Sequence, residues 1–177
     1  IADTDGDGTI DGSASEWAIG RSVASVMSSD GSVIAGYAND GIINRAFRWD
    51  ATTGMVSIAD TDGDGVVGTP GSGEWATGSG GVEVMSSDGS VLGGHLQGTN
   101  NVMSGYRWDA TNGMVNIADA NGDGVVDGSS SEWATGYTNV GAMNADGSVI
   151  GGSTIDGIEH RAFRWDATNG MVNIADT

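Results

Sequence analysis

Three short stretches with an acidic or amide side chain at every second position are the part of this sequence most suited to chemistry. Each stretch follows an Ile-Ala pair, ends on Gly-Asp-Gly and is followed by a Glu-Trp pair; they span residues 3–8, 60–65 and 119–124. Side chains in this pattern offer several oxygens at once, which is what a hard cation such as Ca²⁺ requires. The sequence therefore predicts about one calcium ion per stretch.

The predicted ligands follow the first half of an EF-hand loop. Counted from the first Asp, positions 1, 3, 5 and 9 supply side-chain oxygens and position 7 its carbonyl. The second half differs, because position 12 of the first loop is Ala14 and no helical pattern flanks the loops, so the Glu before Trp is the candidate bidentate ligand. The candidate ligands are Asp3, Asp5, Asp7, Thr9, Asp11 and Glu16 in the first loop, Asp60, Asp62, Asp64, Val66 and Glu74 in the second, and Asp119, Asn121, Asp123, Val125, Asp127 and Glu132 in the third.

The second loop is expected to bind calcium more weakly than the other two. Gly68 stands at its position 9, where the other loops have Asp11 and Asp127. An acidic turn that binds no particular ion is the alternative for all three loops, but three copies at the same place in a repeat disfavour it. Magnesium is less suitable than calcium because it retains its waters and demands a strict octahedron.

The loops recur because the whole chain is a tandem repeat. The repeats span residues 1–57, 58–116 and 117–173, and a further copy starts at 174–177. Such periods indicate solenoids, propellers or arrays, so we expect one continuous array. The chain opens at a calcium loop without an initiator Met and stops inside the next, which suggests a mature or excised piece of a longer protein. An open array is favoured over a closed three-repeat ring.

Each repeat is predicted to contain four short strands and no helix. In the first repeat, strands over 17–27 and 32–37 flank an Asp-Gly hairpin signal, a loop over 38–44 leads to an alternating strand at 45–49, and a last strand at 55–59 feeds the next calcium loop. A sheet this small cannot bury its own apolar face. The expected fold is all-β, with three tandem four-stranded antiparallel units stacked as a propeller-like or open solenoid array and calcium loops between units.

Composition points to ions as partners and to an exported protein. Six Arg, no Lys and 24 acidic residues give a formal charge of -18, which disfavours nucleic acid and anionic membranes as partners. No Cys is present, so calcium rather than a disulfide would supply extra stability, and weak calcium sites suit the extracellular medium. Apolar runs are far too short to span a membrane. We expect a secreted or cell-surface location.

Other side chains favour packing over catalysis. Within the strand at 45–49, Phe47 and Trp49 share one face and Arg48 lies on the other; Arg48 and its counterparts are expected to pair with acidic neighbours or cover strand edges. His95 and His160 stand at non-equivalent places, which argues against a shared histidine metal site or a serine triad. Repeat-locked tryptophans favour an inter-repeat core over a sugar-stacking surface. They are Trp17, Trp75 and Trp133 in one series and Trp49, Trp108 and Trp165 in the other.

The second half of each repeat resembles a known extracellular module. The pattern Ser-x-Asp-Gly-Ser-Val-x-x-Gly, a loop, Arg-Ala-Phe-Arg-Trp and then Gly-Met-Val is similar to the HAF-type repeat of bacterial surface proteins and autotransporter passengers. Residues 29–56 and 145–172 match well, and 87–115 match with Ser-Gly-Tyr in place of His-Ala-Phe. The resemblance implies a secreted, stacked β repeat and little about activity. The calcium loop, which resembles dockerin-like and thrombospondin-type loops, is an addition to that family.

These features predict a non-enzymatic, calcium-stabilised extracellular repeat protein with a structural or adhesive role, such as a segment of a bacterial surface fibre or matrix. Its expected partners are calcium ions, further copies of itself and glycans, without nucleic acid binding or membrane insertion. A calcium-dependent carbohydrate-binding, lectin-like module is the alternative.

Overall fold

The computed structural model describes residues 18–60, 76–98, 102–120 and 132–175, which form twelve strands. No helix capable of crossing a membrane occurs within these ranges. The strands are β1 (Ser22–Met27), β2 (Val33–Asn39), β3 (Asn44–Asp50), β4 (Gly54–Ser57), β5 (Ala76–Met85), β6 (Val91–Gly98), β7 (Met103–Asp109), β8 (Gly113–Asn116), β9 (Thr138–Met143), β10 (Val149–Ile155), β11 (His160–Asp166) and β12 (Gly170–Asn173).

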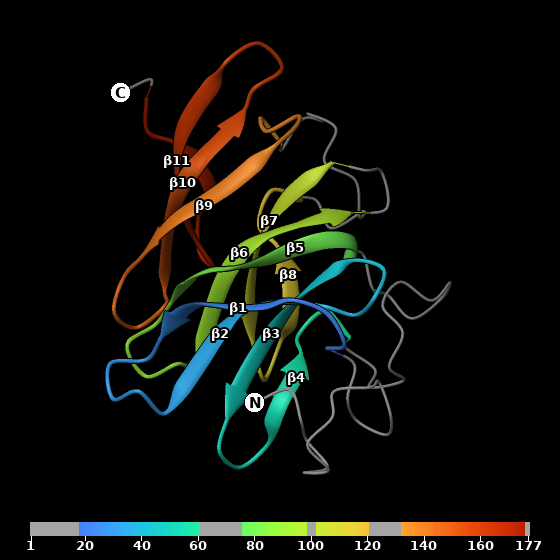
Figure 1. Ribbon diagram of the computed structural model, residues 1–177. Helices are drawn as coiled ribbons and strands as arrows, with labels where there is room; N and C mark the ends of the chain where they lie inside the picture. The colour runs from blue at the N-terminus through green and yellow to red at the C-terminus, as the bar shows by residue number, and fades with distance from the viewer. Residues whose placement is uncertain (1–17, 61–75, 99–101, 121–131, 176–177) are drawn as a thin grey trace.

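The strands form one four-stranded antiparallel sheet per repeat, each with its strands in chain order (Figure 1). We call β1–β4 the first sheet, β5–β8 the middle sheet and β9–β12 the last sheet. The prediction of an all-β chain with three tandem four-stranded antiparallel units is therefore confirmed. Each pair of neighbouring strands is joined locally, as the Asp-Gly signals indicated.

The strand boundaries in the first repeat differ from the prediction by one residue at several ends and by two or more at three of them. β1 begins at Ser22, since the described residues before it are not in a strand. β2 continues through Asn39 into the predicted loop, because Asn39 still pairs with Asn44 of β3. β4 ends at Ser57, and Ile58 beyond it turns into the core between two sheets.

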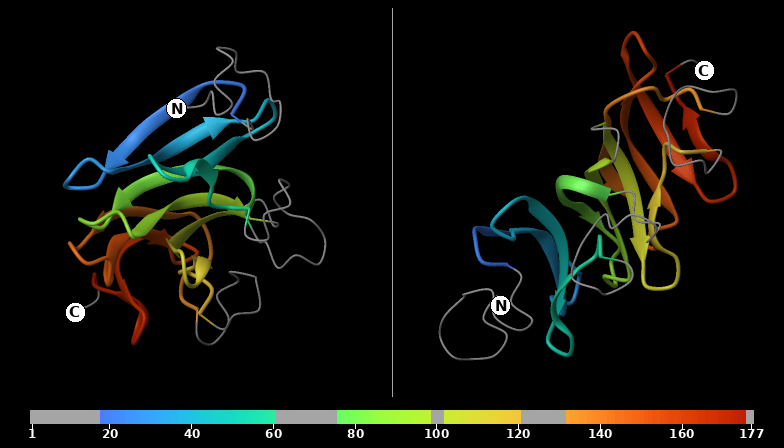
Figure 2. Two further views of the ribbon diagram at one scale, coloured as in Figure 1. Left: turned by 90° about the horizontal axis from the view of Figure 1, so that it is seen from below. Right: turned by 90° about the vertical axis from the view of Figure 1, so that its right-hand side faces the viewer.

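The three sheets pack against each other in chain order (Figure 2). β5 contacts β1, β2 and β3, and β9 contacts β5, β6 and β7, so the middle sheet is covered on both faces. The first and last sheets lie at opposite ends of the fan in Figure 2. Burial of apolar side chains between sheets is what stabilises units that cannot bury enough surface alone.

The hydrophobic core lies at the two junctions between sheets. At the first junction, Leu92 and Tyr106 of the middle sheet pack with Ala46 of the first sheet and with Ile58. At the second junction, Ile150 and Phe163 of the last sheet pack with Ile117, Val140 and the half-buried Val84. Ile58 and Ile117 occupy equivalent places in the repeat, so both junctions are built the same way.

Backbone hydrogen bonds link the hairpin turns of successive sheets. The Ser29 N–H donates to the Ser87 carbonyl, and the Ser87 N–H donates to the Ala145 carbonyl, both at 2.8 Å. These bonds join turns 58 residues apart along the chain, so they form a ladder that runs from sheet to sheet. The ladder sets the register of one sheet on the next.

A glycine in each turn allows the close approach. Gly89 and Gly147 both have φ near +72°, a left-handed conformation that glycine adopts without strain. A Cβ on Gly89 would lie 2.6 Å from the Cβ of Val33, and one on Gly147 would lie 2.5 Å from the Cβ of Val91. Each turn therefore rests directly on a valine of the preceding sheet.

Candidate functional site

Most predicted calcium ligands fall outside the described residues. Asp60, Asp119 and Glu132 are described. The ligands that lie outside are Asp3, Asp5, Asp7, Thr9, Asp11, Glu16, Asp62, Asp64, Val66, Glu74, Asn121, Asp123, Val125 and Asp127. Within the described ranges alone, no three His, Cys, Asp or Glu side chains gather in a metal-binding group.

Glu132 lies next to the start of the third loop. Its side chain is buried, at 4% exposure, and its Oε1 accepts a hydrogen bond from the Ala120 N–H at 3.0 Å. This contact spans twelve residues and brings the predicted bidentate ligand beside the residue that follows Asp119. A buried carboxylate must be compensated by hydrogen bonds or by a cation. The Ala120 N–H supplies one such bond and keeps Glu132 close to Asp119, the first predicted ligand of the same loop.

Each described loop start is anchored in a junction core. Asp60 follows the buried Ile58 and Ala59, and Asp119 follows the buried Ile117 and Ala118. The Ile58 and Ile117 N–H groups also bond to the third strand of their own sheets, at 3.1 and 3.0 Å. The first predicted ligands of the second and third loops, Asp60 and Asp119, thus directly follow residues buried at the junctions between sheets.

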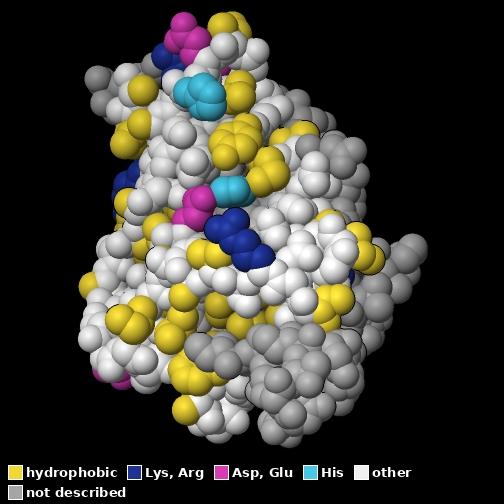
Figure 3. Space-filling model, viewed as in Figure 1, with side chains coloured by type: hydrophobic (Ala, Val, Ile, Leu, Met, Phe, Trp, Pro, Cys, Tyr) yellow, Lys and Arg dark blue, Asp and Glu magenta, His cyan; other side chains and the backbone are white. Residues whose placement is uncertain are grey.

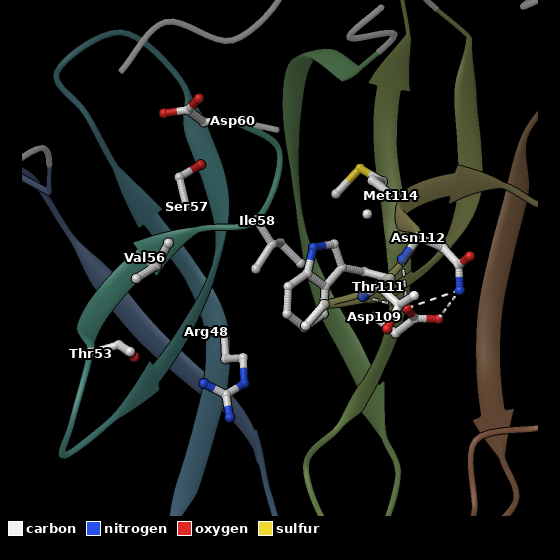
Figure 4. Close-up of a pocket in the computed structure, with 13 residues that line it drawn as sticks. Arg48, Thr53, Val56, Ser57, Ile58, Asp60, Asp109, Thr111, Asn112 and Met114 are labelled. Atoms are coloured by element: carbon white, nitrogen blue, oxygen red, sulfur yellow. Dashed lines mark hydrogen bonds between the residues drawn. The ribbon is translucent and has the colours of Figure 1, made fainter. Parts of the chain in front are cut away.

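A pocket of about 620 Å³ opens between the first and middle sheets (Figure 4). The first sheet contributes Arg48 of β3, and Asp60 lies at the rim. The middle sheet contributes the turn at Asp109, whose carboxylate oxygens accept hydrogen bonds from the Asn112 side chain at 3.0 and 2.8 Å. Arg48 and Asp109 of this pocket are therefore already engaged within their own turns.

An Arg-Asp pair shapes the turn between the third and fourth strands of every sheet. The pairs are Arg48–Asp50, Arg107–Asp109 and Arg164–Asp166. Asp50 also accepts two turn N–H groups, from Thr52 and Thr53, at 2.8 Å each. The Arg48 hydrogen bond, followed by these backbone bonds, holds the pKa of Asp50 below its usual range. The predicted pairing of these arginines with acidic neighbours is confirmed.

In the Asp-Gly hairpin turns between the first and second strands, the Asp carboxylate also accepts several hydrogen bonds. Asp30 accepts hydrogen bonds from the Ser32 N–H and from the hydroxyls of Ser28 and Ser32, at 3.0, 2.7 and 2.8 Å. These bonds, led by the one from the Ser32 backbone, lower the pKa of Asp30 to about 2. Asp88 has the same surroundings, and the bond from the Ser86 hydroxyl is the largest cause that lowers its pKa to about 2.

One pair of polar side chains, Glu83 and His95, has no equivalent in the other two repeats. Nδ1 of His95 lies 2.9 Å from Oε1 of Glu83, on the wall of a pocket of about 350 Å³ between the first and middle sheets. Tyr37 lines the same pocket, and the Arg21 guanidinium lies 5.8 Å from its ring centre. Figure 3 shows the face on which histidine, acidic and basic side chains meet among hydrophobic ones.

The Glu83–His95 pair was not found from the sequence, although His95 was seen to lack a counterpart. Equivalent positions hold Ser25 and Gly141 for Glu83, and Tyr37 and Ser153 for His95. The signal present in the sequence was that two positions of the middle repeat carry residues unlike those at the equivalent positions of the other repeats. Pairing them required the β5–β6 register, which no local pattern supplies.

The described tryptophans pack against the hydrophobic core. Trp49, Trp108 and Trp165 pack against the junction clusters or the first-sheet cluster. Trp133 packs against the second junction, and its indole N–H donates to the Met171 carbonyl at 2.9 Å. These four favour packing over sugar stacking; Trp17 and Trp75 lie outside the described residues.

No family model and no curated protein sequence matches this chain. Solved structures with a similar backbone include TolB from Acinetobacter baumannii, with a TM-score of 0.48 and 17% sequence identity. The match covers 83% of this chain and 30% of the TolB chain. This chain therefore spans less than a third of the structure it matches.

Proposed function

We propose that the protein is a non-enzymatic, calcium-stabilised extracellular repeat protein with a structural or adhesive role, a segment of a bacterial surface fibre or matrix component. Its three sheets would form a propeller-like or open solenoid array with a calcium loop at each joint. The HAF-type resemblance of the strand residues supports the bacterial surface location. Calcium is the ion of choice because the loops offer oxygen ligands alone.

The placement of the cationic side chains carries this proposal. The chain has six Arg and no Lys. Five Arg form ion pairs with Asp at the strand turns, and Arg21 lies over the Tyr37 ring. The sheets thus use the chain's own cations, and the formal net charge of -18 is what remains after all six Arg are counted. Solvent cations are the counter-charge left for the acidic loops.

Calcium would act by making the joints between sheets rigid. Each loop connects the fourth strand of one sheet to the first strand of the next, and Asp60 and Asp119 are attached to residues buried at the junctions. An ion that binds the first residues of the loop and the Glu at its end would fix that connection. Because such a site forms only in the folded chain, the binding free energy adds to the folding free energy.

Thermal unfolding with and without a chelator tests the proposal. A site saturated at a hundred times its Kd adds about 2.7 kcal/mol, and each kcal/mol shifts the Tm by about 2–4 °C in a chain of this size. We expect chelation to lower the Tm by roughly 5–10 °C per site. A Tm that does not change in excess chelator would refute calcium stabilisation.

A matched pair of variants assigns the effect to a loop. Glu132→Gln should reduce the rise in Tm that calcium produces, because it replaces the charged carboxylate beside the third loop with a neutral amide. Glu159→Gln removes an exposed carboxylate from a strand turn and should leave that part unchanged. Equal calcium dependence in both variants would remove Glu132 from the ligand set.

The lectin-like alternative has less support among the described residues. It relies on exposed tryptophans, whereas Trp133 is held by a hydrogen bond and by packing at the second junction. Binding to a glycan array that is lost in Trp17→Ala or Trp75→Ala, with the fold intact, would favour the lectin-like function instead.

A further inference from the structure

A pocket of about 350 Å³ between the first and middle sheets owes its shape to a position at which the repeats differ. Gly81 lies in its wall, whereas the equivalent residues of the other repeats are Val23 and Asn139. A Cβ on Gly81 would lie 3.2 Å from the Cβ of Tyr37, which lines the pocket from the first sheet. The missing side chain therefore leaves room between the two sheets here.

The middle repeat also places polar side chains of its own in this wall. Glu83 and His95 have no equivalents in the other repeats. Gln97 lies two residues after His95, on the same face of β6, and corresponds to Ile155 in the last repeat. Divergence of an otherwise regular repeat at a single pocket indicates a role that the repeat architecture itself does not require.

The carboxylate of Glu83 has acceptor capacity that the described part of the chain does not use. Its Oε1 lies 2.9 Å from Nδ1 of His95, but the two groups are not aligned for a hydrogen bond. Among the described residues, neither Oε2 of Glu83 nor Nδ1 of His95 has a hydrogen-bond partner. An ionised carboxylate can accept about four hydrogen bonds, and a buried one without donors is costly. A ligand that supplies donors to this group would therefore bind favourably.

The rest of the wall disfavours several kinds of ligand. Glu83 is the one carboxylate among the described residues that line the pocket, and its charge disfavours anions. A metal ion would lack ligands, because no three ligating side chains gather within the described ranges. Ser25, Asn44 and Gln97 supply hydroxyl and amide groups, whose desolvation by an apolar ligand would be costly. A neutral molecule with several groups that both donate and accept hydrogen bonds fits this wall best.

We propose that this pocket binds one ring of a neutral sugar. Glu83 would accept hydrogen bonds from sugar hydroxyls, and the amides of Asn44 and Gln97 would donate to others. The ring of Tyr37 would pack against the apolar C–H face of the sugar. Small-molecule pockets measure about 300–1,000 Å³, so a volume at the lower end suits a single ring. The lining contains no predicted calcium ligand and no Trp, so this site is distinct from the calcium loops and from the lectin-like alternative.

Nuclear magnetic resonance of the two imidazoles tests the proposal. The histidines of this chain are His95 and His160, and His160 is exposed on the last sheet, so one set of signals reports on the pocket and the other is an internal control. The probes are the methyl glycosides of glucose, galactose, mannose and N-acetylglucosamine, titrated at constant pH in calcium and again in chelator. We expect at least one glycoside to shift the His95 signals saturably, in the millimolar range, and to leave the His160 signals unchanged.

Two variants with matched controls assign the response to the pocket. Glu83→Gln keeps the shape of the side chain and removes its charge, so glycoside affinity should fall about tenfold. Glu159→Gln removes an exposed carboxylate elsewhere and should leave the affinity unchanged. Gly81→Val places the side chain of the first repeat against Tyr37 and should abolish the response, whereas Gly141→Val, at a glycine with open space around it, should not. Circular dichroism checks that each variant is folded.

His95 signals that do not move with any of the four glycosides would overturn the proposal, as would an affinity that Glu83→Gln leaves unchanged. Zinc chloride and ethylammonium chloride, titrated separately without chelator, represent cationic ligands. A saturable response to either of them and none to the glycosides would overturn the sugar class. A glycoside response that is lost in chelator while the fold remains would overturn the proposal in favour of a calcium-dependent site. Calcium stabilisation is judged by the Tm alone, so the two proposals can fail separately.

Discussion

Several described turns of the sheets contain one aspartate that accepts several hydrogen bonds. Asp30 and Asp88 bind a backbone N–H and two hydroxyls within their hairpins. Asp50 binds two backbone N–H groups and an Arg. All these donors favour the ionised carboxylate, so each aspartate must stay charged for its turn to keep this form.

The lowered pKa values predict acid sensitivity that is independent of calcium. The pKa of Asp30 and of Asp88 is about 2 in the folded protein, against 3.8 ordinarily. Because the folded-state pKa is depressed, these groups stabilise the fold above about pH 4, and this contribution is lost as pH falls toward 2. In chelator, the Tm should therefore fall over this range.

The Asp30→Asn/Asp88→Asn double variant should show a smaller fall in Tm between pH 4 and pH 2 than the wild type, by a few degrees. Glu159→Gln, which removes an exposed carboxylate from the β10–β11 turn and leaves the β1–β2 and β5–β6 turns unchanged, serves as the control. If the double variant and the wild type lose the same Tm over this range, the turn carboxylates do not contribute to the acid sensitivity.

At the scale of the elements, the junction between sheets depends on turns that reach the preceding sheet. Gly89 and Gly147 contact Val33 and Val91, while Gly31 has no such valine beside it among the described residues. The three glycines share a φ of +72° to +74°, so their backbone strain on substitution is matched. Comparing them separates the cost of the left-handed backbone from the cost of disturbing the junction.

Alanine substitution should rank these glycines. Gly31→Ala should destabilise by about 1–2 kcal/mol through left-handed strain. Gly89→Ala and Gly147→Ala should cost about 1–3 kcal/mol more, because the new Cβ overlaps a valine. Urea unfolding of the three variants in chelator measures the difference. Equal urea midpoints for the three variants would show that contact between the turns and the preceding sheet does not contribute to stability.

The strands could be predicted from the sequence because their signals are local. Alternation at 45–49 placed Phe47 and Trp49 on one face and Arg48 on the other, and the structure puts Phe47 and Trp49 in one cluster and Arg48 at the first junction. The position of Ile58 was not predicted, since its burial depends on the next sheet. The Glu83–His95 pair was missed for the same reason, as it depends on register between strands.

At the scale of the whole molecule, two junctions between buried side chains hold the three sheets together. Stability in such an array is nearly a sum of repeat terms and nearest-neighbour terms. The second predicted calcium loop lies between the first and middle sheets in the sequence, and its residues 61–75 are outside the described part of the chain. Its sequence differs from the other loops at Gly68, which takes the place of Asp11 and Asp127.

We therefore predict that the three calcium sites are unequal and that the joint between the first and middle sheets opens first. The second loop lacks the side-chain oxygen that position 9 supplies in the other two loops, so calorimetric titration should resolve one weaker site beside two stronger ones. Gly68→Asp should bring the weak site close to the others, and at limiting calcium it should slow hydrogen exchange at the first junction, near Ile58. Val126→Asp is the control, because it adds the same charge to the third loop at a position that is not a predicted ligand. Three indistinguishable sites in the wild type, or equal effects of the two substitutions, would contradict the assignment of position 9 as a ligand.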